Sequence, residues 1–387
     1  MTSRLPLYFD YHATTPVADA VLDAMMPYFK EHFGNPSSHL HPHGWLAEAA
    51  VSKARDQVAA CLGATAREIT FTSGATESNN LAILGVAEAY ADQGCHFITT
   101  RFEHKSVLDS FKELERRGCL VTYLPPDSQG LVSALAVKEA LRPETVLVSV
   151  MWANNEIGTV QPVAEIGRVC KEASVFFHVD AVQGIGWLNL SVDDMGADLL
   201  SISAHKIYGP KGVGALYVRR KDPRVEVKPL LFGGSQERGL RPGTLNVPGI
   251  VGLGVAAELV AAHRVEDHAR IAILRDGLWT GLQKGVSGVL LNGSPTQRLP
   301  NNIAFRIPGL DPEAFFSQVR DHIALSAASA CLGSGGDGSH VLKSIGLSDA
   351  DARSSLRLGL GRGTTEEQCT QALEILTRAL NQCRRKS

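Results

Sequence analysis

Short apolar runs and longer segments with helical periodicity alternate through the first two thirds of the chain. The pattern predicts strands over 68–71 and 96–99, a helix over 76–93 between them and a second helix over 106–117. Strands that are separated by single helices need crossover connections, which produce a mostly parallel sheet with helices on both faces. The sequence therefore predicts an α/β fold for this part of the chain.

The pattern changes near residue 264. A long helix is predicted over 266–284, and short strands are predicted around 302–306 and 323–327. A capping box at 364–367 is expected to open a final helix. This part of the chain is typical of a second, smaller α+β domain.

Polar side chains come shortly after three of the predicted strands. His104, Asn155 and Asp180 each follow an apolar run. In an open α/β sheet the ligand binds beyond the carboxyl ends of the strands. We therefore expect these three side chains to lie at a common site.

The most specific chemical signal comes from an acid and a lysine. Asp180 ends an apolar run, and Lys206 directly follows Ser203-Ala204-His205 and precedes a Gly-Pro turn. Each residue alone has an ordinary explanation, as a buried loop cap or a surface turn. Together they are what pyridoxal phosphate requires, because a lysine must bond to the cofactor's aldehyde and a carboxylate must keep the pyridine nitrogen protonated. The rival Lys211 lies beyond the turn, where a fixed approach to the cofactor is harder.

The chain thus resembles the class V, aminotransferase-like pyridoxal phosphate enzymes, and among them the cysteine desulfurases of the NifS/IscS type. Matching segments run from Tyr-Phe-Asp-Tyr-His-Ala-Thr-Thr-Pro at 8–16 to Ser-Leu-Arg-Leu-Gly-Leu-Gly-Arg at 355–362, so the resemblance covers nearly the whole chain. It implies fold type I of the pyridoxal phosphate-dependent transferases and a homodimer. The expected large domain spans 15–263, and the small domain combines 1–14 with 264–387.

A Ser-Gly-Ala-Thr segment that ends at Thr76 follows a predicted strand and opens a helix. Its backbone N–H groups and the helix dipole favour an anion. The resemblance places Ala75 and Thr76 at the cofactor phosphate, and it extends this role to Ser203, His205 and, in the partner subunit's site, Thr244. An ordinary turn after a Pro-Gly pair is the alternative for Thr244.

The resemblance also assigns roles around the ring and the substrate. His104 is expected to stack on the pyridine ring and to exchange protons, for which an ordinary imidazole pKa of about 6.5 is suited. Gln183 and Asn155 match residues that bond the phenolic oxygen of the ring. Asn155 and Arg357 are expected to hold the substrate carboxylate, since a guanidinium offers paired donors. Arg362 is the fallback, and a capping or surface role is the alternative for Arg357.

Cys331 differs from the other six cysteines because four glycines stand in the eight residues that follow it. A loop of this composition has few backbone constraints, which suits a nucleophile that must enter the pocket to collect sulfur and leave to deliver it. An incidental thiol is the alternative. The chain carries Ser-Ala-Ala-Ser-Ala-Cys here, whereas close relatives carry Ser-Ser-Gly-Ser-Ala-Cys and a loop rich in Ser and Thr.

The predicted reaction is removal of sulfur from L-cysteine, which yields L-alanine and a persulfide on Cys331. The acceptor is expected to be a protein, such as an iron-sulfur scaffold or a relay for thio-cofactor or nucleic-acid sulfur biosynthesis. Selenocysteine lyase and class V aminotransferase are alternatives on the same fold. A nicotinamide-dependent dehydrogenase is suggested only by a loose glycine pattern at 252–257, which helix packing explains better.

Composition adds limits to this reading. The 387 residues, 44% of them hydrophobic, suffice for two domains, and the net charge of -2 gives no reason to expect direct nucleic-acid or membrane binding. An apolar signal core or a run of about 18 apolar residues is not found, so a soluble cytoplasmic protein is predicted. Seven cysteines without a C-x-x-C pair predict neither a disulfide framework nor a metal site.

Overall fold

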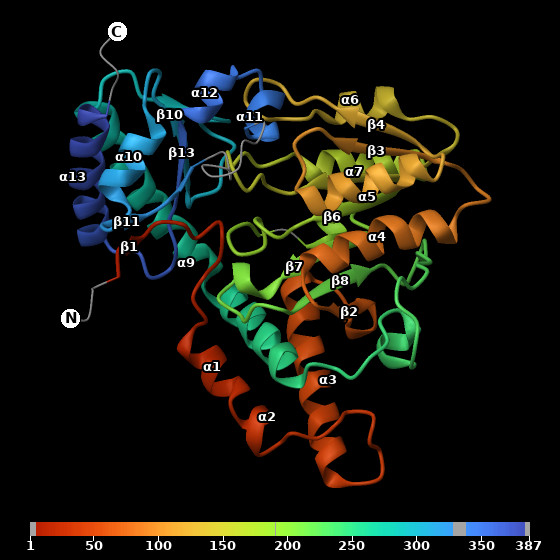
Figure 1. The fold of residues 1–387 in the computed structure, drawn as a ribbon. Helices are drawn as coiled ribbons and strands as arrows, with labels where there is room; N and C mark the ends of the chain where they lie inside the picture. The colour runs from red at the N-terminus through yellow and green to blue at the C-terminus, as the bar shows by residue number, and fades with distance from the viewer. Residues whose placement is uncertain (1–4, 190, 328–337, 384–387) are drawn as a thin grey trace.

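The computed structural model describes residues 5–189, 191–327 and 338–383 (Figure 1). Its largest sheet has seven strands in the order β2-β8-β7-β6-β5-β3-β4. β8 is antiparallel to both of its neighbours, and the other pairs are parallel. The predicted mostly parallel sheet is therefore confirmed. The strands are β2 (Ile69–Thr72), β3 (His96–Thr100), β4 (Leu120–Leu124), β5 (Thr145–Met151), β6 (Phe176–Asp180), β7 (Leu199–Ser203) and β8 (Gly214–Val218).

Helices cover both faces of this sheet, because successive side chains of a strand point to opposite sides. Phe97 and Leu147 pack in an apolar cluster with α4 (Ala75–Ala89) and α5 (Lys105–Arg116). Their neighbours Ile98 and Val148 pack in the cluster that holds α3 (Pro42–Leu62) and α9 (Val247–Gly285). Strands buried on both faces explain why the apolar runs of the sequence are continuous. The remaining helices of this part are α1 (Asp19–Met25), α2 (Pro27–Lys30), η1 (Ala66–Glu68), α6 (Ala134–Ala140), α7 (Val163–Glu172), α8 (Val192–Met195), η2 (Ala204–Lys206) and η3 (Gln236–Gly239).

A second apolar core surrounds two smaller sheets, β12-β13-β10-β9 and β1-β11. Because β1 pairs in parallel with β11, the start of the described chain lies beside this core (Figure 1). This pairing supports the division that we propose, a large domain over 15–263 and a small domain of 1–14 with 264–387. The elements are β1 (Leu7–Tyr8), β9 (Leu290–Leu291), β10 (Asn302–Arg306), α10 (Pro312–Val319), β11 (Ile323–Ala324), β12 (Ser326–Ala327), α11 (His340–Ser344), α12 (Asp349–Arg353), β13 (Ser355–Gly359) and α13 (Glu366–Gln382).

The long helix α9 begins earlier than predicted. It runs for 39 residues from Val247, where the Asn246 side chain caps its first turn, so the predicted start at residue 266 is wrong. Small residues allow the early turns to pack closely. A Cβ atom on Gly254 would lie 2.6 Å from the Cα of Ala54 in α3. The glycines at 252–257 therefore serve helix packing, as expected, and the proposed domain boundary falls inside one continuous helix.

By length and composition alone α9 could cross a membrane, and it is the one described helix that meets both criteria. Most of its apolar 18-residue stretch is buried inside the protein. The helix packs on α3 and α1. Such burial is typical of a core helix.

Two further details differ from the sequence analysis. The capping box of α13 is formed by Thr365 and Gln368, one residue later than predicted, because the Thr364 hydroxyl instead accepts from the Gly361 N–H at 2.9 Å. Cys95 and Cys119 form a disulfide with a Cα–Cα distance of 4.9 Å, which the sequence analysis did not expect. These cysteines lie side by side because they immediately precede the parallel strands β3 and β4.

Candidate active site

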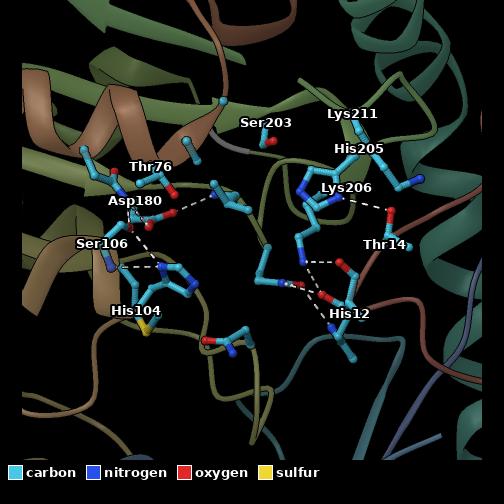
Figure 2. A pocket seen from close by; sticks show the side chains of 18 of the residues that line it. His12, Thr14, Thr76, His104, Ser106, Asp180, Ser203, His205, Lys206 and Lys211 are labelled. Atoms are coloured by element: carbon cyan, nitrogen blue, oxygen red, sulfur yellow. Dashed lines mark hydrogen bonds between the residues drawn. The ribbon is translucent and has the colours of Figure 1, made fainter. Parts of the chain in front are cut away.

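A cavity of about 610 Å³ lies at the carboxyl ends of the central parallel strands (Figure 2). This volume is in the range of small-molecule sites. Thr244 does not line the cavity of its own chain and is exposed, and Cys331 lies outside the described residues. The cavity brings together the other predicted site residues, Ala75, Thr76, His104, Asn155, Asp180, Gln183, Ser203, His205, Lys206 and Arg357.

Lys206 ends the short helix η2, which directly follows β7. Its Nζ donates to the carbonyl oxygen of Ala13 at 2.8 Å and to that of His12 (Figure 2). Burial, together with the charge of Arg357, lowers the pKa of Lys206 to about 8. About a tenth of the amine is therefore unprotonated at pH 7, far more than at an ordinary lysine. Lys211 also lines the cavity, but its side chain is exposed.

Asp180 is the last residue of β6, and it is buried. One carboxylate oxygen accepts from the Asn79 side-chain amide at 2.8 Å, and the other accepts from the Val182 N–H at 3.1 Å. The carboxylate is thus held in one orientation at the cavity wall. Asn79, whose amide also donates to Ser106 at 2.9 Å, was not among the residues predicted from the sequence.

His104 is the N-cap residue of α5, and its Nδ1 accepts from the Ser106 N–H at 3.2 Å. Burial lowers the pKa of His104, and the nearby Asp180 carboxylate opposes this effect without overcoming it. The ring is therefore neutral near pH 7. Because Nδ1 accepts a hydrogen bond from the backbone, the neutral ring carries its own proton on Nε2.

The start of α4 has the geometry that the predicted anion pocket requires. Gly74 has a φ of +147°, a backbone conformation that residues with a side chain rarely adopt. No described side chain caps the start of the helix. Its first backbone N–H groups therefore remain available to an anion. Thr76 and Ser203 add hydroxyl groups to this part of the cavity.

His205 lies beside this anion pocket. Its Nδ1 is 3.1 Å from the Thr14 hydroxyl oxygen. Burial, with the charges of Lys206 and Lys211, lowers the pKa of His205 to about 4. The imidazole is therefore a neutral hydrogen-bonding group at physiological pH.

Glu77, in the first turn of α4, forms an ion pair with Arg241. Glu77, which lines the cavity, accepts from the Ser73 N–H at 2.8 Å and from Arg241 Nε at 3.0 Å. Burial alone would raise the pKa of Glu77, but these bonds lower it. The carboxylate thus stays ionised, and the guanidinium offsets a charge that would otherwise repel a phosphate. Neither residue of this pair was predicted from the sequence.

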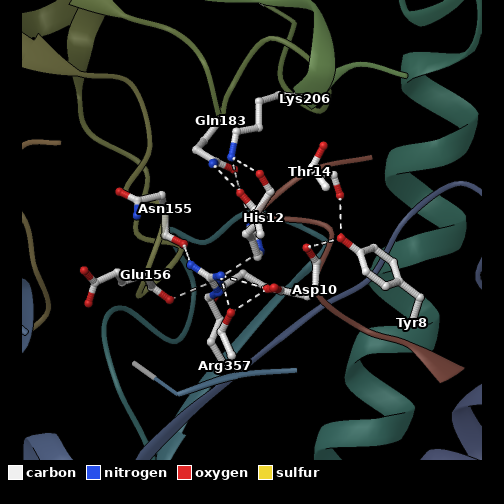
Figure 3. Close-up of polar contacts among 12 residues, drawn as sticks. Tyr8, Asp10, His12, Thr14, Asn155, Glu156, Gln183, Lys206 and Arg357 are labelled. Carbon is white, nitrogen blue, oxygen red and sulfur yellow. Dashed lines mark hydrogen bonds and ion pairs between the residues drawn. The ribbon is translucent and has the colours of Figure 1, made fainter. Parts of the chain in front are cut away.

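Arg357 on β13 is buried and lines the cavity next to Asp10 and Asn155 (Figure 3). Its terminal nitrogens donate to Asp10 at 2.8 Å, to the Ser326 hydroxyl at 2.9 Å and to the Asn155 carbonyl at 2.8 Å. Its buried Nε has no hydrogen-bond partner among the described residues. A fixed guanidinium with a spare donor is suited to a small carboxylate.

The N-terminal loop supplies residues that the sequence analysis did not place at the site. Asp10 pairs with Arg357, and His12, Ala13 and Thr14 line the cavity. The only signal in the sequence was that 8–16 matched the family, which did not say where this loop would fold.

The residues described here fit pyridoxal phosphate. A buried amine with a lowered pKa, a fixed carboxylate and an uncapped helix start face one cavity. These are the groups that the cofactor's aldehyde, pyridine nitrogen and phosphate require.

Comparisons with known proteins agree with this fit. The aminotransferase class-V family profile matches residues 7–371. The cysteine desulfurase IscS of Anaeromyxobacter sp. (strain K) is 50% identical over 384 residues, which cover 99% of this chain and 95% of that protein. A solved NifS-like protein is 38% identical with a TM-score of 0.90, covering 97% of this chain and 100% of its own. A structure of SspA in complex with cysteine is 42% identical with a TM-score of 0.80, covering 91% and 98%.

Proposed function

Because the chain belongs to the class-V aminotransferase family and, within it, is a cysteine desulfurase, we propose that its cavity binds pyridoxal phosphate and L-cysteine through the residues predicted from the sequence. The convergence of the Lys206 amine, the Asp180 carboxylate and the start of α4 on one cavity carries this proposal. These three features meet the separate requirements of one cofactor, namely those of its aldehyde, its pyridine nitrogen and its phosphate.

When bound, pyridoxal phosphate supplies an aldehyde that bonds to amines and a ring that accepts electrons. Lys206 would hold the aldehyde carbon, and Asp180 would hold the pyridine nitrogen. Other residues would hold the rest of the cofactor. These are Ala75, Thr76, Ser203 and His205 at the phosphate, His104 at the face of the ring, and Gln183 and Asn155 at its phenolic oxygen.

Proton transfer falls to Lys206 and His104. With a pKa of about 8, the Lys206 amine can both accept and release a proton at Nζ near neutral pH. We propose that it removes the proton from the α-carbon of cysteine. His104 can relay a proton in the same cavity only after it has taken one up, because a neutral imidazole is too weak an acid to release the proton on its Nε2.

Cys331 is the proposed sulfur acceptor. Its thiolate attacks the substrate sulfur, the substrate C–S bond breaks, and an S–S bond forms on the protein. The substrate carbon gains a proton, so that the products are L-alanine and one persulfide. The persulfide is then passed to an acceptor protein, such as an iron-sulfur scaffold, in the cytoplasm.

A homodimer completes the proposal. Large apolar side chains are exposed on and beside α1 to α3, among them Met26, Phe29 and Phe33, and Phe232 is 88% exposed. Apolar surface of this extent supports a protein interface. Since Thr244 is exposed and outside its own cavity, it could contribute to a phosphate site only in the partner subunit.

The decisive experiment is a visible spectrum of the purified protein, followed by addition of L-cysteine with a thiol reductant. A yellow protein that releases sulfide and alanine in equal amounts is expected. Transfer of the amino group to a keto acid would instead favour an aminotransferase. Much faster turnover of selenocysteine than of cysteine would favour a selenocysteine lyase.

The carboxylate contact of Arg357 gives a further prediction. Arg357→Ala should lower kcat/KM for cysteine by about 10- to 100-fold, mainly through KM, since a charge-assisted hydrogen bond is lost. Arg357→Lys should recover only part of this loss because a lysine lacks the planar fork. Steady-state kinetics on alanine release measure both effects.

Arg362→Ala is the matched control. Arg362 Nε pairs with Asp267 at 2.8 Å and does not line the cavity. Its loss should leave KM within about twofold of the unsubstituted value, as is usual for changes away from the site. Equal effects of the two alanine variants would contradict the assignment of Arg357.

A further inference from the structure

The imidazole of His12 is buried between the seven-stranded sheet and the four-stranded sheet, and only 1% of the residue is exposed. Its Nδ1 lies 3.0 Å from Oε1 of Gln183, on the loop after β6 (Figure 3). Its Nε2 lies 3.1 Å from Nδ2 of Asn302, on β10. One side chain therefore joins the large sheet to the small one at the wall of the cavity.

Arg298, next to Asn302, decides which groups donate and which accept in these hydrogen bonds. Arg298 can only donate, and its Nη1 donates to Asn302 Oδ1 at 2.6 Å. The Asn302 amide nitrogen therefore faces His12, so the imidazole Nε2 must accept. The single proton of the neutral ring is then on Nδ1, and it donates to Gln183 Oε1.

The pKa of His12 agrees with this assignment of donor and acceptor nitrogens. Burial, with the positive charges of Arg357 and Lys206, lowers the pKa of His12 to about 3. The ring therefore remains neutral at any pH at which the enzyme would work. A neutral imidazole has one donor and one acceptor, and both are used here.

The backbone of His12 bonds to two predicted site residues. Its carbonyl oxygen accepts from Gln183 Nε2 at 3.1 Å and from Lys206 Nζ. The amide of Gln183 is thus bonded to His12 through both of its ends, and the His12 carbonyl oxygen and the Nδ1–H group together fix its orientation. Neither ring nitrogen of His12 has hydrogen-bonding capacity left for a ligand.

We propose that His12 is a positioning residue of the active site, whose Nδ1–H fixes the amide of Gln183 so that its N–H group faces the phenolic oxygen of the cofactor. The inference rests on the proposed function, because it gives Gln183 that partner. A donor to this oxygen withdraws the negative charge that retains the proton on the lysine nitrogen. Loss of the donor should therefore raise the pH at which the bound cofactor loses that proton.

Two substitutions of His12 test the roles of its two ring nitrogens separately. His12→Asn places an amide N–H near the position of Nδ1, whereas His12→Gln places an amide oxygen near that of Nε2. The first variant can still donate to Gln183, and the second retains only the bond with Asn302. The readout is the pH titration of the visible band of the resting holoenzyme.

We expect the midpoint of His12→Asn to remain close to that of the unsubstituted protein. His12→Gln should shift the midpoint upward by about 0.5 to 1 pH unit, the equivalent of one hydrogen bond. In a Gln183→Ala background, His12→Gln should cause no further shift, because the two residues act in series. A full shift in that background, or equal midpoints for the two His12 variants, would overturn the proposal.

A measurement without substitutions covers the case in which His12→Gln does not fold. Imidazole ¹⁵N chemical shifts of the holoenzyme should show a buried neutral histidine that is protonated on Nδ1. The opposite tautomer at His12 would refute the inference. A protein that binds no cofactor would instead refute the proposed function, so the two failures are distinguishable.

Discussion

Lys206→Ala should lose desulfurase activity by at least about 1,000-fold, because the substitution removes both the attachment point of the cofactor and the group that moves the proton. The visible band of the lysine-bound cofactor should also disappear. Absorption spectra and alanine release measure the two effects. Substantial alanine production by this variant would falsify the assignment of Lys206.

Lys211→Ala is the matched control for this result. Lys211 lines the same cavity, but its side chain is exposed and lies beyond the Gly-Pro turn. The variant should keep the visible band and most of the activity. A colourless Lys211→Ala protein, with a yellow Lys206→Ala protein, would reverse the order of the two lysines.

The lowered pKa of Lys206 adds a test by pH. Only the free amine attacks an aldehyde, so the rate at which the apoprotein takes up the cofactor should rise as the pH increases and level off above about 8. A lysine with an ordinary pKa would still gain rate up to about 10.4. Stopped-flow absorbance across this range distinguishes the two cases.

Cys331→Ser should bind the cofactor normally and release no alanine above background. The hydroxyl of serine is a much weaker nucleophile than a thiolate and does not take up sulfur under these conditions. Mass spectrometry after a single addition of cysteine should find one extra sulfur atom on the unsubstituted protein and none on the variant. Full turnover by Cys331→Ser would reject this cysteine as the acceptor.

Cys61→Ser provides the comparison. The Cys61 thiol lies 3.2 Å from the guanidinium of Arg264. Burial nevertheless raises the pKa of Cys61, so little thiolate is present. This variant should retain the extra sulfur and normal alanine release. The pair of variants thus separates the loss of one particular thiol from the general effect of replacing a cysteine.

Local pattern was sufficient to predict much of the large sheet. The strand predicted at 96–99 is β3 (His96–Thr100), and the helix expected at 106–117 is α5 (Lys105–Arg116). Such elements are decided by residues close in sequence, through continuous burial or helical periodicity. The start of α9 was missed because glycines that weaken a helix in isolation are stabilised there by close packing against α3.

The residues of the site divide in the same way. Asp180 and Lys206 were predicted because the first ends a strand and the second comes shortly after one, and parallel strands bring such positions to one edge. The pairs Glu77 with Arg241 and Asp10 with Arg357 were not predicted. Their members are far apart in the sequence, and nothing local to either member indicates its partner.

By itself, the sequence determined the parallel sheet, the edge at which the chemistry occurs and the identity of the groups that fit pyridoxal phosphate. Those features depend on the order of residues within single strands and helices. Only the tertiary structure decided that the N-terminal loop closes one wall of the cavity, where the carbonyl of His12 meets an amine 194 residues later. The loop reaches that position because β1 pairs with β11, a contact inside the small domain between residues far apart in the sequence.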